Sequence, residues 1–67
     1  MQIFPTEVLA IICQTGELGI TFEGIIEEME EDRNVKIDRK ELKNVLNYLS
    51  TEMIYCIDGI YKARFDD

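Results

Sequence analysis

The stretch 54-IYCIDGIYKARF-65 decides the fold, because it has the form of two strands joined at Asp58-Gly59. Asp-Gly is a strong two-residue hairpin turn, since a type I′ turn needs positive φ at both central positions. The turn sets a register in which Ile54 pairs with Ala63. The sequence therefore predicts a β-hairpin, with strands over residues 53–57 and 60–65.

Alternation along the two strands divides the hairpin side chains between two faces. One face is wholly apolar and is predicted to pack on the core: Ile54, Cys56, Tyr61, Ala63 and Phe65. The other face includes two cations and is predicted to face solvent: Tyr55, Ile57, Ile60, Lys62 and Arg64. Exposed apolar surface on a small domain needs an explanation. Two explanations stay open. Either this face is an interface, or its isoleucines pack under a neighbouring loop.

The spacing of apolar residues predicts three helices before the hairpin. Their ranges are 5–14, 22–33 and 39–51. A short extended segment around Ile20 separates the first two. This order of elements predicts a small α+β winged helix-turn-helix, with three helices plus a C-terminal β-hairpin wing. Sixty-seven residues make one domain at most, so residues 1–67 are predicted to form a single domain.

Residues at the helix ends support these boundaries. Gly16 suits the end of the first helix, and Asn34 suits the end of the second. Thr21 can cap the start of the second helix. Asp38 and Glu41 are three residues apart, so they predict a capping box at the start of the third helix.

The chain is acidic, with 14 Asp and Glu against 7 Lys and Arg and a net charge of −7. Proteins bind nucleic acid largely by neutralising phosphates with Lys and Arg, so this balance disfavours a duplex partner. It favours a basic protein segment, although an acidic surface can serve solubility alone. The densest acidic group lies on the predicted second helix: Glu27, Glu28, Glu30, Glu31 and Asp32.

The residue types argue against catalysis. The chain has no histidine, which excludes His-based acid–base catalysis, Cys–His pairs and nearly all structural zinc sites. The clustered carboxylates have no evident pocket that would separate their pKa values. Residues 30–41 imitate a calcium loop, but Val35 stands where the sharp turn needs glycine. We therefore expect no enzyme activity, no cofactor and no metal.

The two cysteines, Cys13 and Cys56, lie in apolar runs and are predicted to be reduced and buried. So few cysteines in so small a domain indicate an intracellular protein. No apolar run is long enough to span a membrane, and no signal peptide is visible.

A nucleic-acid alternative stays open, because five of the seven basic residues gather at the start of the third helix. This is the recognition-helix position of helix-turn-helix proteins. The residues that would contact DNA come from that helix and the wing: Arg39, Lys40, Lys43, Asn47, Lys62 and Arg64. Interleaved Asp38 and Glu41, and the acids at 30–32, weaken this alternative.

The segments EVLAIICQTGELGITFEGIIEEM (7–29) and LKNVLNYLSTEMIYCID (42–58) resemble the C-terminal winged-helix domain of the replication protein A middle subunit. The resemblance covers nearly the whole chain. It implies a nuclear replication or repair module that does not bind DNA and docks basic helical segments on an acidic surface beside the wing. The implied partner-binding residues are Glu52, Tyr55, Cys56 and Asp58. The outward-facing Ile57 and Ile60 join them from the hairpin alternation.

Three features depart from that pattern: the lone Met53 between Glu52 and Ile54, a wing tip that is shorter and less acidic than that of the family, and the long segment 31–37. IDRKEL (37–42) followed by IYCIDGIYK (54–62) resembles the cullin-type C-terminal winged helix, especially that of the anaphase-promoting complex. This second resemblance implies a ubiquitin ligase scaffold. Either family implies a protein-binding domain that is a monomer or part of a larger complex. Self-association through the outer wing face is a further alternative.

Overall fold

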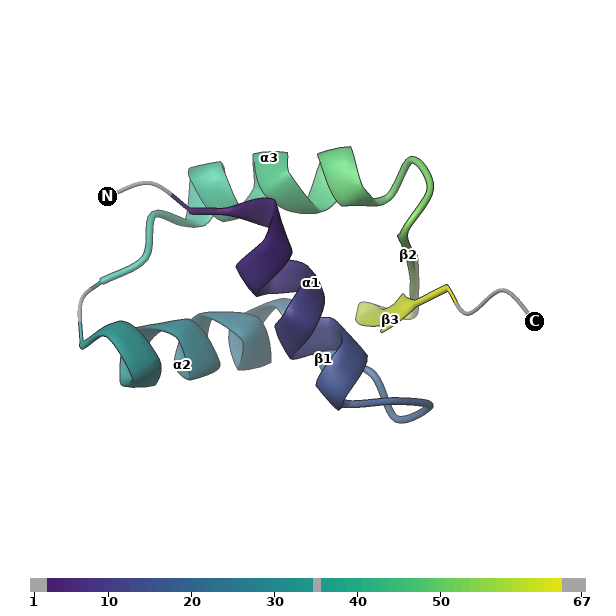
Figure 1. Ribbon diagram of the computed structural model, residues 1–67, viewed down its shortest axis with the longest axis horizontal. Coiled ribbons are helices and arrows are strands. Elements are labelled where there is room, and N and C mark those ends of the chain that lie inside the picture. The colour runs from purple at the N-terminus through teal and green to yellow at the C-terminus, as the bar shows by residue number, and fades with distance from the viewer. Residues whose placement is uncertain (1–2, 35, 65–67) are drawn as a thin grey trace.

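The computed structural model of the chain describes residues 3–34 and 36–64. Its elements are α1 (Pro5–Gln14), β1 (Ile20–Thr21), α2 (Phe22–Arg33), α3 (Arg39–Leu49), β2 (Ile54–Ile57) and β3 (Ile60–Ala63). The helices group together and the hairpin lies at one end of the molecule (Figure 1). The domain is an α+β winged helix with a C-terminal hairpin, as the sequence predicts.

The hairpin has the predicted turn and register. Asp58 and Gly59 have φ values of 53° and 77°, the positive values that a type I′ turn requires. Ile54 pairs with Ala63, and the remaining pairs follow in the predicted order. β1 pairs antiparallel with β3, so the sheet order is β1-β3-β2 and the last strand lies in the centre.

The helix ends follow the predicted signals with two differences, both in α3. The Thr21 hydroxyl accepts a hydrogen bond from the Gly24 amide at 3.0 Å, and Asn34 ends α2 with a φ of 58°. Asp38 caps α3, but the Glu41 carboxylate does not complete the predicted box. It accepts a hydrogen bond from the Ile3 amide at 2.7 Å and so ties the N-terminal segment to α3. α3 ends at Leu49, two residues before the predicted end.

The core is built from one apolar stripe of each helix and the base of the hairpin. Its fully or almost fully buried residues are Ile3, Val8, Ile12, Ile25, Ile26, Met29, Leu42, Leu46, Leu49, Ile54 and Ala63. Burying a side chain of this size contributes roughly 1.5–3 kcal/mol. These contacts fix α1 and α2 beside each other and orient the polar face of α3 outward.

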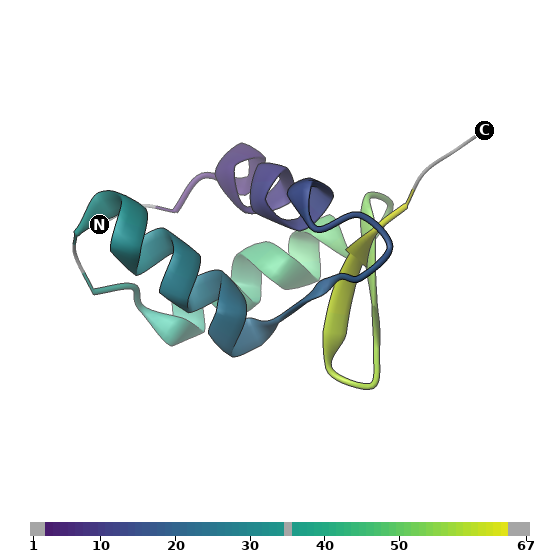
Figure 2. The same cartoon turned by 90° about the horizontal axis from the view of Figure 1, so that it is seen from below.

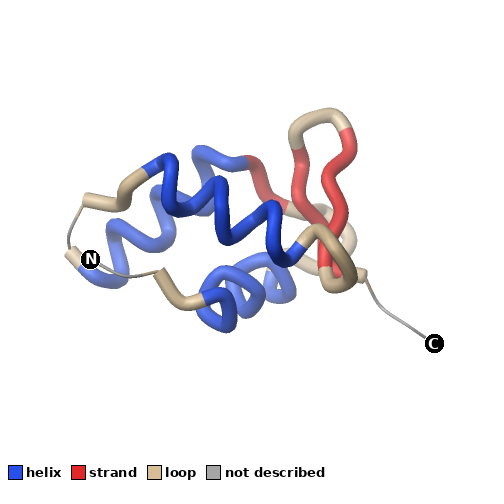
Figure 3. The backbone as a smooth tube through the Cα atoms, turned by 90° about the horizontal axis from the view of Figure 1, so that it is seen from above, coloured by secondary structure: helices blue, strands red, loops and turns tan. Residues whose placement is uncertain are grey.

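The prediction that both cysteines are buried is wrong, since each is exposed. Cys13 follows the buried Ile12 in α1 but lies outside the buried stripe of that helix, which comprises Val8 and Ile12. Cys56 is on the core face of β2, but it lies nearer the turn than Ile54, where the hairpin extends past the helices (Figures 2 and 3). Tyr61, opposite Cys56, is half-buried at the edge of the core. Phe65, also predicted for this face, lies outside the described residues.

Candidate functional site

The predicted partner-binding residues of the wing differ in exposure. Glu52, Cys56, Ile57 and Asp58 are exposed, and Ile57 retains 56% of its accessible surface. Tyr55 and Ile60 are only half-exposed. The wing therefore presents a smaller apolar surface than the strand alternation predicts.

The loop before β1 explains the partial burial of Ile60. Gly19 in this loop has a φ of +74°, and its backbone lies against β3. A Cβ atom at this position would lie 2.5 Å from Ile60 Cγ2 and 2.8 Å from Lys62 Cγ. Of the two explanations left open, Ile60 follows the second, because it tucks under a neighbouring loop. Ile57 has no such cover in the described part of the chain.

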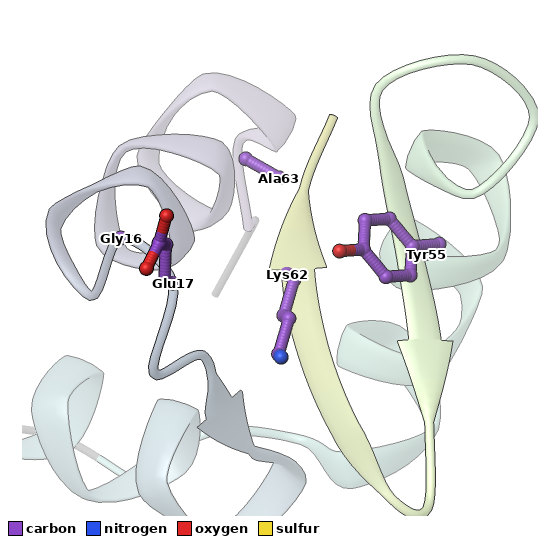
Figure 4. Close-up of a pocket in the computed structure, with 5 residues that line it drawn as sticks. All are labelled: Gly16, Glu17, Tyr55, Lys62 and Ala63. Atoms are coloured by element: carbon purple, nitrogen blue, oxygen red, sulfur yellow. The ribbon is translucent and has the colours of Figure 1, made fainter. Parts of the chain in front are cut away.

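The two wing cations gather around Tyr55. A small open cavity there is lined by Gly16, Glu17, Tyr55, Lys62 and Ala63. Tyr55 and Lys62 project from neighbouring strands, and Glu17 lies on the facing loop (Figure 4). The Arg64 guanidinium lies 5.6 Å from the centre of the Tyr55 ring, within range of a cation–π interaction. Lys62 and Arg64 thus belong to a cluster on the sheet.

The acidic surface lies away from the wing. Besides Glu23, which pairs with Arg39, four exposed carboxylates project from α2: Glu27, Glu28, Glu31 and Asp32. α2 begins next to β1 and runs away from the hairpin (Figure 2). Glu30 is half-buried, and its carboxylate accepts a hydrogen bond from the Ile37 amide at 3.0 Å. The structure therefore separates the predicted acidic surface from the predicted wing residues.

A groove runs between α1 and α2 beside these carboxylates, with a volume of about 280 Å³. We call it the α1–α2 groove, and it is lined by Glu7, Ala10, Ile11, Gln14, Glu28 and Asp32. Exposed Ala10 and half-buried Ile11 contribute apolar surface. Glu7 forms an ion pair with Arg33, so Glu28 and Asp32 carry the acidic charge of the groove.

The sequence analysis missed this groove because its lining comes from two helices. A partial signal was present in the sequence of α1, where Ala10 and Gln14 lie four residues apart and so share one side of the helix. That spacing defines an outer face of α1, but the sequence does not show that this face adjoins the acidic residues of α2.

A second groove, between α1 and α3, is almost entirely apolar. It is lined by Phe4, Pro5, Thr6, Leu9, Tyr48, Leu49 and Met53. Three of these are large exposed side chains: Phe4 at 51%, Tyr48 at 63% and Met53 at 46%. The sequence analysis missed this groove as well, because its residues come from three separate segments.

The residues of the nucleic-acid alternative separate into three places. Lys40, Lys43 and Asn47 lie on one exposed face of α3. The Arg39 guanidinium is held by two hydrogen bonds to the Glu23 carboxylate, one of them 3.0 Å long, and lies 6.0 Å from the centre of the Phe22 ring. The hydrogen bond from Arg39 lowers the pKa of Glu23. Lys62 and Arg64 belong to the Tyr55 cluster.

No protein-family model matches the chain. No curated protein and no solved structure matches it at a significant level. The resemblances to the replication protein A and cullin-type domains therefore stay predictions. Across residues 3–34 and 36–64, no helix is long and apolar enough to cross a membrane. Over the same residues, no three His, Cys, Asp or Glu side chains are grouped as a metal ion would require.

Proposed function

We propose that this domain is a non-catalytic protein-interaction module that holds a basic amphipathic helix of a partner in the α1–α2 groove. One observation supports the proposal: the groove combines apolar surface with solvent-exposed carboxylates that a cation can reach. Ala10 and Ile11 provide the apolar surface, and Glu28 and Asp32 provide the charge. Sequence analysis predicts the same class of partner but places it at the wing.

Each part of the groove matches one part of such a helix. An amphipathic helix docks through apolar anchors spaced three and four residues apart. These anchors would contact Ala10 and Ile11, while lysines and arginines flanking them would reach Glu28 and Asp32. The ion pair of Glu7 with Arg33 joins the two walls, so the groove is already formed without a partner. The net charge of −7 would speed the encounter with a basic segment.

The exposed Ile57 supports a second candidate location for the same function. It lies next to Asp58, and a partner covering it would use the outer wing face that the sequence analysis favours. The two resemblances would place either surface in a nuclear replication or repair assembly, or in a ubiquitin ligase scaffold. Both the parent assembly and the location in the cell are part of the proposal.

The test is a fluorescence anisotropy titration with a labelled model peptide that has leucines on one helical face and lysines and arginines around it. Ala10→Lys places a cation and added bulk in the groove, so it is expected to weaken binding by about tenfold or more. The double change Glu28→Gln/Asp32→Gln is expected to weaken it by about threefold to tenfold at low salt. All three positions lie at the surface, so the variants should fold.

Glu27→Gln is the matched control, because it removes one exposed carboxylate of the same helix outside the groove lining. It is expected to change the dissociation constant by less than about twofold. Weakening by Glu27→Gln as large as that by the double change Glu28→Gln/Asp32→Gln, with no effect of Ala10→Lys, would mean that the peptide senses only the overall charge. Loss of binding in Ile57→Ser alone would move the site to the wing.

A further inference from the structure

β2 is the outer strand of the sheet, and it carries none of the features that usually protect such an edge. Among the described residues the sheet order is β1-β3-β2, so one side of β2 has no neighbouring strand. In Figure 4, β2 is the strand that carries Tyr55, with β3 beside it. Edge strands usually contain a lysine, a proline or a bulge that prevents pairing with another chain. The sequence of β2, IYCI, has no charge and no proline, and its register with β3 is uninterrupted.

The turn determines which backbone groups of β2 point toward the open side. A two-residue turn closes on a hydrogen-bonded pair, here Ile57 and Ile60, and such pairs alternate along an antiparallel ladder. The Arg64 amide donates to the Met53 carbonyl at 2.9 Å, as this alternation requires. Cys56 therefore belongs to a non-hydrogen-bonded pair, and its amide and carbonyl point away from β3. Because Cys56 is exposed, a strand from outside can reach both groups.

We propose that the open edge of β2 pairs antiparallel with β2 of a second copy of this chain, about a two-fold axis at Cys56. Both copies then use the same residues, as a closed dimer requires. In this register Tyr55 of one copy lies opposite Ile57 of the other, in a non-hydrogen-bonded pair, where side chains lie closest. An aromatic residue opposite a β-branched one is a favourable cross-strand pair. The pairing covers Ile57, which keeps 56% of its surface exposed in the single chain.

The charges around β2 favour a second copy as the occupant of this edge. β2 contributes no charged side chain, so two acidic chains meet there without opposing carboxylates. In the same register, Asp58 of one copy lies opposite Ile54 of the other, at the end of β2 next to Arg64. The Arg64 guanidinium lies 5.6 Å from the centre of the Tyr55 ring, so it leans from the β3 side toward the open edge. Each copy thus offers a cation to Asp58 of the other, which makes the two ends of the interface electrostatically complementary.

The dimer is expected to be weak, because an interface built on one strand pair falls below the about 1,000 Å² of a stable complex and each copy has a net charge of −7. The experiment therefore takes the reduced 67-residue chain to millimolar concentration, at about 0.1 M salt, where the Debye length is about 10 Å. Sedimentation equilibrium gives the dimer fraction, and NMR hydrogen exchange gives the protection of each amide. Protection of the Cys56 amide is expected to rise at least about threefold as the dimer forms, because this amide has a strand partner only in the dimer. The Tyr55 amide faces β3 in both states and should change much less.

Ile57→Lys places a cation on the edge and removes the cross-strand pair, so it is expected to weaken dimerisation about tenfold or more. Leu18→Lys is the matched control, because Leu18 is also an exposed aliphatic side chain, at 86%, and the change of charge is the same outside β2. It is expected to leave the dissociation constant of the dimer within about twofold. Circular dichroism melting confirms that each variant is folded.

Oxidation with diamide tests the register. The proposed pairing places the two Cys56 Cα atoms about 5.5 Å apart, a separation that a disulfide can span. As the S–S bond forms, diamide takes up the two hydrogen atoms of the thiols. Cys13→Ser, which retains Cys56, should give a linked dimer at least about tenfold faster than Cys56→Ser, whose exposed Cys13 meets another copy only by collision.

Three results would overturn the proposal. Cys56 protection that does not depend on concentration would exclude the second copy and leave the edge to a strand of another protein. Equal dimerisation of Ile57→Lys and Leu18→Lys, or equal rates of cross-linking through the two cysteines, would exclude pairing at β2. None of these outcomes bears on the α1–α2 groove, which shares no residue with β2.

Discussion

Gly19 and Gly16 make a matched pair that tests how the loop before β1 packs on the hairpin. Both have positive φ, +74° and +58°, so an alanine at either position would adopt a left-handed conformation. They differ in their surroundings. A Cβ at Gly16 would have no atom within 4 Å, whereas one at Gly19 would also meet the Tyr61 carbonyl oxygen at 2.9 Å.

These geometries predict different losses of stability. The left-handed conformation costs an L-residue about 1–2 kcal/mol, and the smaller entropy of the unfolded alanine chain offsets part of that cost. Gly16→Ala is therefore expected to lower the free energy of unfolding by about 1 kcal/mol. Gly19→Ala adds overpacking of about 1–3 kcal/mol, for a total of about 2–4 kcal/mol. The Tyr61 carbonyl belongs to the central strand, so it has little freedom to move away.

Thermal unfolding followed by circular dichroism measures the difference. At about 4–8 °C for each kcal/mol in a domain of this size, Gly16→Ala should lower Tm by about 4–8 °C. Gly19→Ala should lower it by at least about twice as much. Equal shifts in the two variants would refute the close packing of the loop against β3, and with it the explanation for the partial burial of Ile60.

Three further predictions concern the core, the thiols and one carboxylate. Ile54→Ala empties a fully buried position and should cost about 2–5 kcal/mol in chemical denaturation; a loss below about 1 kcal/mol would contradict its place in the core. Cys13 and Cys56 are exposed, so both should react with a thiol reagent in the native protein at a rate that does not depend on unfolding. A slow reaction of either thiol would support the prediction from sequence that it is buried. In an NMR titration, Glu23 should have a pKa below the ordinary value of a glutamate, because Arg39 donates hydrogen bonds to it, and this pKa should rise in Arg39→Gln. Because its folded pKa is depressed, the stabilisation from this pair is present above the unfolded pKa and is lost as the pH falls through the folded pKa. An unchanged Glu23 pKa in the variant would contradict the pairing.

The sequence predicted the elements well where a few neighbouring residues determine the conformation. Thr21 caps the next helix through an amide three residues away, and Asp58-Gly59 sets both the turn and the register of the hairpin. These are local effects, so periodicity and turn chemistry are sufficient to identify them.

The sequence failed where the outcome depends on distant segments. Strand alternation places Cys56 on the core face, but it does not show how far the helices extend along the hairpin. The partner of Glu41 is the Ile3 amide, 38 residues away in the sequence, so the local capping box was the reasonable but incomplete prediction. The two grooves likewise need the packing of α1 before their linings can be named.

The central position of β3 has a consequence for how the chain acquires its structure. Within the described residues, both other strands pair only with β3, and the pairing of Ile20 with Tyr61 joins segments about forty residues apart. While β3 is still inside the ribosome, neither β1 nor β2 has its pairing strand, although the three helices have already been synthesised. We therefore expect the sheet to form in one step after the helices, and the amides of β3 to be among the most protected in hydrogen exchange.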